Sequence, residues 1–179
     1  KNGKPIDTSM GLTPLEGLVM GTRTGDIDPA VVFHLQRVAG MSVDEVDTLF
    51  NKKSGMKGMT GESDMRSVWE VINNTSDPEA SKRARTAMDV YINRLLKYVG
   101  SYAAELGGLD VITFTAGIGE NDDDVRRELA EALAPFGVKI DVEANNVRSG
   151  EPRVISAPDS TVTIYVFPTN EELAIARQA

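Results

Sequence analysis

The sequence contains no cysteine, one histidine, one tryptophan and no long apolar run. Without cysteine, the chain can form no disulfides, and it has no thiolate that could act as a nucleophile or bind a metal. A membrane-spanning helix needs about 18 or more consecutive apolar residues, so the sequence predicts none. Positive charge is in deficit, with 19 Lys and Arg against 27 Asp and Glu, a net charge of −8. Because nucleic acids and acidic membranes are bound through an excess of positive charge, we expect neither as a partner.

The remaining composition is that of an ordinary folded domain. Apolar residues make up 41 % and charged residues 26 % of the 179 residues, as in soluble globular proteins. This length predicts one large domain or two small ones, with a core that needs no disulfide or metal. The chain starts at Lys1 in polar, turn-like sequence that is not a signal peptide. We therefore expect it to be part of a longer protein.

Helix start signals recur through the first two thirds of the chain. They are Asp28-Pro29, the capping box Ser42–Glu45, the segment beginning at Ser63, and Asp77-Pro78. The last of these predicts the longest helix, to about Leu106, with a buried stripe of apolar and tyrosine side chains at steps of three and four residues. Residues 1–28 and the glycine-rich residues 53–61 are predicted to be loops.

Strands are predicted only in the last third of the chain. The β-branched segments 111–115, 138–140, 154–156 and 162–167 predict four strands. A glycine loop over 116–121 and a helix ending near Gly137 are expected after the first strand, and Asn170 is expected to cap a last helix over 171–177. This alternation predicts an α/β fold with helices covering the sheet. The helices before the first strand are then an insertion or a second layer.

The clearest candidate binding site lies in residues 111–133. This segment is predicted to be a strand followed by a glycine loop and a helix. Glycine lets a ligand approach the backbone closely, and amides at a helix start favour an anion. This pattern predicts a phosphate or nucleotide near Gly117–Asn121, although the loop matches neither a P-loop nor the dinucleotide fingerprint. The aspartates at 122–124 would repel a phosphate from that helix start, so a plain turn remains the alternative.

Other candidates are ambiguous on spacing alone. Arg23, between Gly21 and Gly25, could clamp a phosphoryl group or be a solvated loop residue. His34 lies in an apolar helix pattern, which favours a structural role over a catalytic base. Glu171 and Glu172 fit the first turn of a helix, where the helix dipole alone explains them, and a metal role is the alternative.

Three segments, in order along the chain, together resemble signature sequences of the acetate kinase family. They are residues 7–29 (DTSMGLTPLEGLVMGTRTGDIDP), residues 114–121 (FTAGIGEN) and residues 168–176 (PTNEELAIA). The second resembles the family's adenosine-binding loop and the third its C-terminal motif. The three segments together span essentially the whole chain, and chance agreement over segments of this length is negligible.

The resemblance implies the fold shared by acetate and sugar kinases, Hsp70 and actin. This fold consists of two RNase H-like α/β domains, each with a central mixed sheet flanked by helices, and a nucleotide bound between them. Residues 1–179 would be the C-terminal, nucleotide-binding and dimerisation domain, with a helical insertion. The N-terminal domain would be absent from this sequence.

The resemblance also implies roles for particular residues. Arg23 corresponds to the arginine that stabilises the transition state, and Glu171 to the glutamate linked to Mg²⁺ or Mn²⁺, with Glu172 open as the alternative. The residues implied in adenosine binding are Asp64, Met65, Arg66, Gly117, Ile118, Gly119, Glu120, Asn121, Val125 and Arg126. At Met65 the family often has Phe, and a methionine can also pack on a base.

The implied function is half of an ATP:acetate phosphotransferase. The parent would be a cytoplasmic homodimer that reversibly converts acetate and ATP to acetyl phosphate and ADP. Two alternatives stay open: a propionate or butyrate kinase, because the acyl pocket would lie in the other domain, or a non-catalytic nucleotide-binding and dimerisation module. We expect the isolated chain to be inactive.

Overall fold

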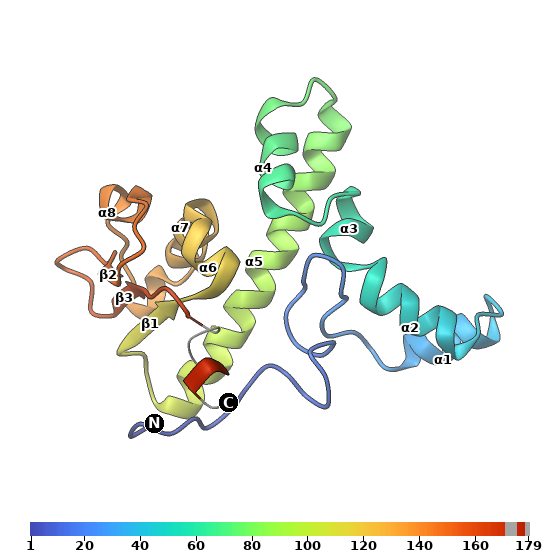
Figure 1. The fold of residues 1–179 in the computed structure, drawn as a ribbon, viewed down its shortest axis with the longest axis horizontal. Coiled ribbons are helices and arrows are strands. Elements are labelled where there is room, and N and C mark those ends of the chain that lie inside the picture. Colours follow the sequence, from blue (N-terminus) through green and yellow to red (C-terminus); the bar gives the residue numbers. More distant parts are fainter. Residues whose placement is uncertain (171–174, 178–179) are drawn as a thin grey trace. The chain divides into compact units, whose positions relative to one another are not determined.

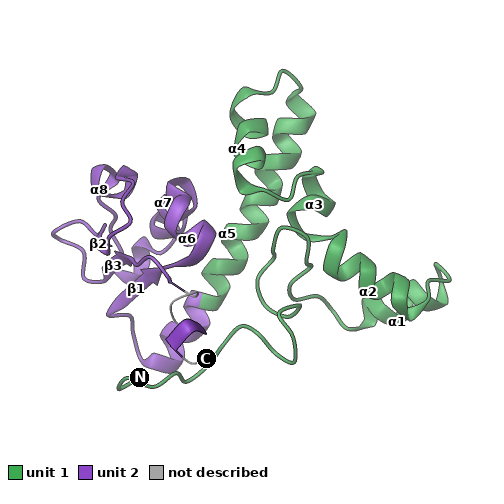
Figure 2. Ribbon diagram, viewed as in Figure 1, with its two compact units in different colours: residues 1–98 green, residues 99–179 purple. Residues whose placement is uncertain are grey.

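A computed structural model describes residues 1–170 and 175–177 of the chain. The chain divides into two compact units, residues 1–98 and residues 99–179 (Figure 2). The boundary falls after Tyr98, inside the long helix α5 (Pro78–Leu106), which appears in light green in Figure 1.

The first unit consists of helices joined by loops. Its helices are α1 (Ala30–Arg37), α2 (Val43–Lys52), α3 (Gly55–Thr60), α4 (Met65–Asn74) and most of α5. Residues 1–28 contain no helix or strand, as predicted. The capping box is also confirmed, because the Ser42 hydroxyl accepts from the Glu45 amide at 3.2 Å and the Glu45 carboxylate accepts from the Ser42 amide at 2.8 Å.

The prediction of a loop over residues 53–61 is wrong, because Gly55–Thr60 form the short helix α3. Glycine does not disfavour a helix at its first residue, and Gly55 has a φ of +61° that lets the chain turn sharply into α3. Gly61 follows the helix with a φ of +89°, which is the usual conformation of a glycine that ends a helix.

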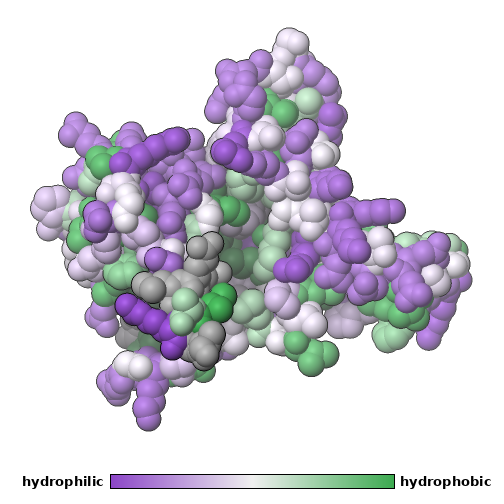
Figure 3. Space-filling model, viewed as in Figure 1, coloured by the Kyte–Doolittle hydropathy of each residue, from purple (hydrophilic) through white to green (hydrophobic). Residues whose placement is uncertain are grey.

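The apolar stripe of α5 is divided between the core and half-buried positions. Ala84, Met88 and Tyr91 are buried, whereas Leu95 and Tyr98 are half-buried. In contrast, α1 has no buried residue, and His34 is exposed there, so its role is not that of a core residue. The surface in Figure 3 is mainly hydrophilic, with hydrophobic patches that include one over α1 and α2.

The second unit contains the sheet. It comprises the end of α5, β1 (Val111–Phe114), α6 (Ala116–Asn121), α7 (Asp123–Ala132), a 3₁₀ turn (Ala134–Phe136), α8 (Val142–Asn146), β2 (Arg153–Val154) and β3 (Thr163–Val166). The strand order is β1-β3-β2, with β1 parallel to β3 and β2 antiparallel to it. Leu133, Ile155 and Ile164 are fully buried in its core. The predicted mixed sheet with flanking helices is therefore confirmed.

Two expectations for this unit are wrong. Residues 138–140 form a single bridge, from Ile140 to Ser156, because Asp141 already caps α8 by accepting from the Ala144 amide at 3.0 Å. Residues 116–121 form the helix α6 rather than a loop, and Ala116, with a φ of +59°, makes the turn out of β1. Gly117 and Gly119 have ordinary helical backbone, so the loop expectation overrated their freedom.

Within the described part of the chain, no helix is both long enough and apolar enough to cross a bilayer.

Candidate functional site

Residues 20–24 form a loop that caps two helices of the first unit and carries Arg23. The carbonyls of Met20, Gly21 and Thr22 accept from the amides of Met56, Lys57 and Ser54 at 3.0, 2.9 and 3.0 Å. These are amides at the start of α3, which have no acceptor within their own helix. The loop therefore satisfies the N-terminus of α3 with its backbone.

The same loop satisfies carbonyls at the end of α2. The Thr24 amide donates to the Phe50 carbonyl at 3.1 Å, and the Thr22 hydroxyl donates to the Asn51 carbonyl at 2.8 Å. Because its backbone is bound on both sides, the loop is held in one conformation and needs no contact from the Arg23 side chain to keep it. That guanidinium remains available for a ligand.

Gly55 lets α3 pack directly on this loop. A Cβ on Gly55 would overlap the Met20 carbonyl oxygen and lie 2.6 Å from the Arg23 carbonyl oxygen. Its positive φ already disfavours any other residue. A glycine is therefore required here for the loop that carries Arg23.

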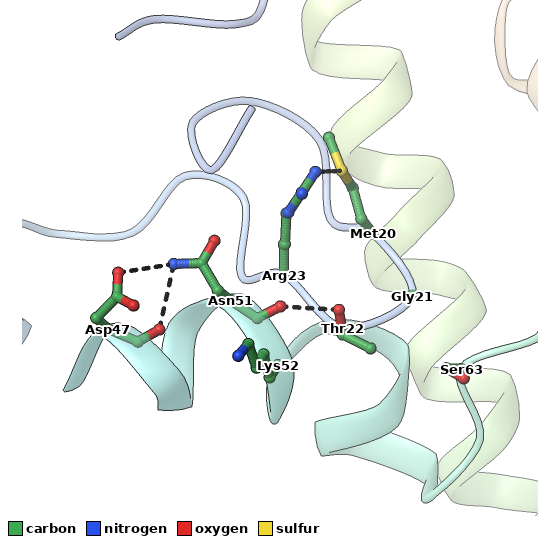
Figure 4. Close-up of a pocket in the computed structure, with 8 residues that line it drawn as sticks. All are labelled: Met20, Gly21, Thr22, Arg23, Asp47, Asn51, Lys52 and Ser63. Atoms are coloured by element: carbon green, nitrogen blue, oxygen red, sulfur yellow. Dashed lines mark hydrogen bonds between the residues drawn. The ribbon is translucent and has the colours of Figure 1, made fainter. Parts of the chain in front are cut away.

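Arg23 faces a cavity of about 620 Å³ between this loop, α2 and Ser63 (Figure 4). The Arg23 guanidinium lies 3.8 Å from the Met20 sulfur, and Lys52 brings a second positive charge to the wall. The acidic lining residue, Asp47, accepts from the Asn51 amide group at 3.0 Å. Two cations and a tethered carboxylate make a pocket that suits a phosphoryl group.

Asp26 anchors the far end of the Arg23 loop to α5. Its carboxylate accepts from the Gly17 amide at 2.8 Å, from Arg94 Nη1 at 2.8 Å and from the Tyr98 hydroxyl at 2.6 Å. Partial burial acts to raise the pKa of Asp26, but the hydrogen bonds from Tyr98, Gly17 and Arg94 outweigh it and lower the pKa. Sequence reasoning missed this residue, because Arg94 lies 68 residues along the chain and no local pattern links the two.

Asp64–Arg66, implied by the resemblance in adenosine binding, begin α4. Asp64 caps the helix by accepting from the Arg66 amide at 2.9 Å, and it pairs with Arg66 Nη2 at 2.6 Å. These hydrogen bonds from the Arg66 side chain and backbone lower the pKa of Asp64 to about 2. The Arg66 side chain is 91 % exposed, whereas Met65 is buried in the first unit. Asp64 and Arg66 thus lie exposed at the start of α4, whereas Met65 belongs to the core of the first unit.

Gly117–Asn121 lie in α6, directly after β1. The carbonyls of Gly117, Ile118 and Gly119 accept respectively from the Asn121 side chain at 2.9 Å, the Asp122 amide at 2.9 Å and Arg126 Nη1 at 2.9 Å. Every one of these carbonyls is therefore satisfied, although a helix this short can pair few of its own groups.

The two glycines of α6 face different surroundings. A Cβ on Gly119 would lie 3.3 Å from the Phe114 carbonyl carbon, so this glycine permits close packing of α6 on the end of β1. A Cβ on Gly117 would meet no atom of the chain within 4 Å. Packing within the chain therefore does not require glycine at position 117, and close approach of a ligand is a reason for glycine there.

Glu120 links α6 to the segment that follows β3. Its carboxylate accepts from the Thr169 amide at 2.9 Å and from the Thr169 hydroxyl at 3.1 Å. The amide hydrogen bond is the main cause that lowers the pKa of Glu120. Glu120 therefore remains ionised and binds the chain two residues before Glu171.

Val125 and Arg126 are both buried, each 2 % exposed, in α7. The aspartates at 122–124 lie at the start of α7, as the sequence predicts. Asp122 caps α7 by accepting from the Val125 amide at 2.9 Å, and Asp124 pairs with Arg127 at 2.6 Å. These carboxylates are thus partly engaged at the helix start.

Glu171 and its alternative Glu172 lie outside the described residues. Within the residues that are described, no group of three or more His, Asp or Glu side chains is arranged to hold a metal ion. The predicted metal residue therefore stays a prediction.

The family model and similar known proteins that match this chain point to acetate kinases. Residues 1–177 match the model of the acetokinase family. An acetate kinase of Corynebacterium aurimucosum is 55 % identical over 179 residues, which are all of this chain and 43 % of that protein. The chain thus spans less than half the length of this relative.

Solved structures agree with the sequence matches. The crystal structure of Porphyromonas gingivalis acetate kinase superimposes with a TM-score of 0.90 at 44 % identity, over 99 % of this chain and 44 % of that one. A propionate kinase from Francisella tularensis gives a TM-score of 0.89 at 41 % identity, over 99 % and 44 %. The fold expected from the resemblance is confirmed by these similarities.

Proposed function

Because this chain belongs to the acetokinase family, we propose that it is the nucleotide-binding and dimerisation half of an ATP:acetate phosphotransferase. The whole protein would convert acetate and ATP reversibly to acetyl phosphate and ADP. The observation that carries the proposal is the position of Arg23, at a cavity that Lys52 also lines and on a loop whose backbone is hydrogen-bonded to both α2 and α3.

Arg23 acts on the phosphoryl group in transfer. Phosphoryl transfer depends on positioning and on neutralising charge on the equatorial oxygens. Because hydrogen bonds to α2 and α3 hold the backbone of residues 20–24, the Arg23 side chain starts from a fixed position, which limits the reorganisation needed to neutralise that charge. Lys52, on the same cavity wall, adds positive potential.

Each unit contains its own group of proposed nucleotide-binding residues. Asp64 and Arg66 form an exposed hydrogen-bonding pair at the start of α4, suited to the adenosine side of the ligand. Gly117–Asn121 form the second group, with open space over Gly117. Val125 and Arg126 support this second group from the interior.

The expected metal ion is Mg²⁺ or Mn²⁺, with Glu171 as its carboxylate. Mg²⁺ prefers oxygen ligands and keeps several waters, so one carboxylate and the substrate phosphates can hold it. When bound, it neutralises phosphate charge. Within the described residues, the chain's own contribution is the pair of hydrogen bonds that Thr169 donates to the Glu120 carboxylate, two positions before Glu171 in the sequence.

Two alternatives are compatible with the same residues. The similarity to a propionate kinase favours testing longer acyl acceptors. A non-catalytic nucleotide-binding and dimerisation module is the second alternative. The proposal also includes a cytoplasmic location and a homodimer. Light scattering tests the homodimer, because a monomer mass at micromolar concentration would contradict it.

The kinase reaction is tested on the whole protein that contains this chain. ATP, Mg²⁺ and acetate, propionate or butyrate are mixed with it, and acyl phosphate and ADP are measured together. We expect turnover to be fastest with acetate, and the isolated chain to give no signal above a blank. A whole protein without acyl phosphate formation would refute the proposal, and a preference for propionate or butyrate would replace acetate as the substrate.

A further inference from the structure

Arg126 is a charged side chain buried in the interior of the second unit, where it meets α6 and α8. Its Nη1 donates to the Gly119 carbonyl at 2.9 Å, its Nε to Asn145 Oδ1 at 2.7 Å, and its Nη2 to the Asn145 carbonyl at 2.8 Å. A single guanidinium thus joins α6, α7 and α8. Only arginine offers donors in a rigid planar fork that can reach both partners at once.

Asn145 is itself held in place, and it is 1 % exposed. Its side-chain amide donates to the Asp123 carbonyl at 2.9 Å, and its backbone amide donates to the Asp141 carbonyl at 2.9 Å. Arg126 therefore binds to a fixed support on one side and to the short helix α6 on the other. Movement of the guanidinium would be transmitted to Gly119.

Keeping a guanidinium buried is unfavourable unless its donors are satisfied. Burial lowers the pKa of Arg126, the nearby charge of Arg153 adds to that effect, and Asp123 and Asp122 oppose it. The aspartates at the start of α7 thus stabilise this buried cation. This gives the acidic run a second role beside capping.

The helix α6 depends on such outside support. It has six residues, and helices of that length are not stable by themselves in water. The bond from Arg126 satisfies the Gly119 carbonyl near the end of the helix, where carbonyls lack partners within the helix and a positive charge is favourable.

We propose that Arg126 is a positioning residue, which does not touch the nucleotide but holds α6 in the conformation that binds it. The inference rests on the proposed function, because it takes Gly117–Asn121 to be a nucleotide-binding segment. If α6 is less often in its bound conformation, the apparent affinity for nucleotide falls by the same fraction. The acetate site would lie in the other domain, so we expect acetate binding to be unaffected.

The test uses Arg126→Lys in the whole protein. Lysine keeps the charge and most of the volume, so the variant is expected to fold, but one ammonium cannot bridge Gly119 and Asn145. The matched control is Ile155→Val, which removes a methyl group from a fully buried side chain of the same unit. Measurements are the KM for ATP, the KM for acetate, kcat, and the rise in Tm on adding ADP.

For Arg126→Lys we expect the KM for ATP to rise about tenfold, the size of one charge-assisted hydrogen bond. The KM for acetate and kcat should change less than about twofold, and the ADP-dependent rise in Tm should shrink. Ile155→Val should lower Tm without ADP but keep the ADP-dependent rise. A second variant, Asn145→Ala, should resemble Arg126→Lys, because it removes one of the guanidinium's supports.

Two results would contradict this inference, and a third would refute the proposed function on which it rests. An unchanged KM for ATP in both Arg126→Lys and Asn145→Ala would show that the guanidinium does not position the site. If Ile155→Val reduced the ADP-dependent rise in Tm as much as Arg126→Lys does, the effect of Arg126→Lys would come from lower stability in general. If the Tm of the wild-type protein did not rise on adding ADP, this would instead refute the proposed function on which the inference depends.

Discussion

Replacing Asp26 by Asn tests how the Arg23 loop is held. Three donors converge on the Asp26 carboxylate: the Gly17 amide, Arg94 Nη1 and the Tyr98 hydroxyl. An asparagine side chain has one acceptor oxygen and an NH₂ group, so at least one of these donors would face another donor. The negative charge opposite Arg94 is also lost.

The expected loss of unfolding free energy is about 2–3 kcal/mol at pH 7. A hydrogen bond to a charged partner contributes about 1.5–3 kcal/mol, and a donor left without an acceptor adds to the loss. Partial exposure weakens the charge effect, since Asp26 and Arg94 side chains are 32 % and 25 % exposed. The control is Asp159→Asn, which removes a more exposed ion pair with Lys139 and should therefore change the unfolding free energy much less than Asp26→Asn does.

The effect of Asp26→Asn should depend on pH in a defined direction. The pKa of Asp26 is lowered in the folded state, so its contribution is complete above the unfolded-state pKa of about 3.9 and is lost as the pH falls through the folded-state value. The difference in unfolding free energy between wild type and variant should therefore be constant from pH 7 to about pH 5 and shrink below about pH 4.

Urea denaturation of the whole protein, followed by circular dichroism at several pH values, measures this difference. Equal stability of the wild type and the Asp26→Asn variant at pH 7 would refute the account of how the loop is anchored. A difference that grows as the pH falls below 4 would refute the assigned ionisation state.

Three further substitutions test the site and the fold. Arg23→Ala in the whole protein should lower kcat about 10²–10³-fold with a smaller effect on the KM for ATP; an unchanged kcat in steady-state assays would remove its assigned role. Gly55→Ala should destabilise the protein by about 2–4 kcal/mol in urea denaturation, because its Cβ overlaps the Met20 carbonyl and its φ is positive. Gly100→Ala should instead raise stability by about 0.5–1 kcal/mol, because a Cβ at this position in α5 meets no atom within 4 Å; a loss of stability would indicate an unseen neighbour.

Local signals in the sequence were sufficient to predict many element starts. Ser42, Asp64 and Asp122 each cap the predicted helix with a side-chain oxygen. Such caps need only residues two or three positions apart, so the sequence contains the whole interaction. The strand at 111–114 and the long helix α5 were predictable for a similar reason, because a sustained pattern of side chains defines them.

Interactions between distant residues account for the errors and the omissions. The helix α3 forms because carbonyls of residues 20–22 accept from its first amides, more than 30 positions away in the sequence. Asp26 and Arg94 are a comparable case. Arg126 could be assigned to the site by resemblance, but its bonds to Gly119 and Asn145 depend on how three helices pack, which no local pattern reveals.

The central claim is that this chain contains a nucleotide site that includes Gly117. Calorimetric titration of the 179-residue chain with ADP tests it most directly, beside Gly117→Ala, a substitution for which the chain itself leaves space. We expect weak binding of ADP that depends little on Mg²⁺ and is weakened in Gly117→Ala, with the circular dichroism spectrum unchanged. No heat of binding at millimolar ADP, or equal affinity of the Gly117→Ala variant, would contradict it.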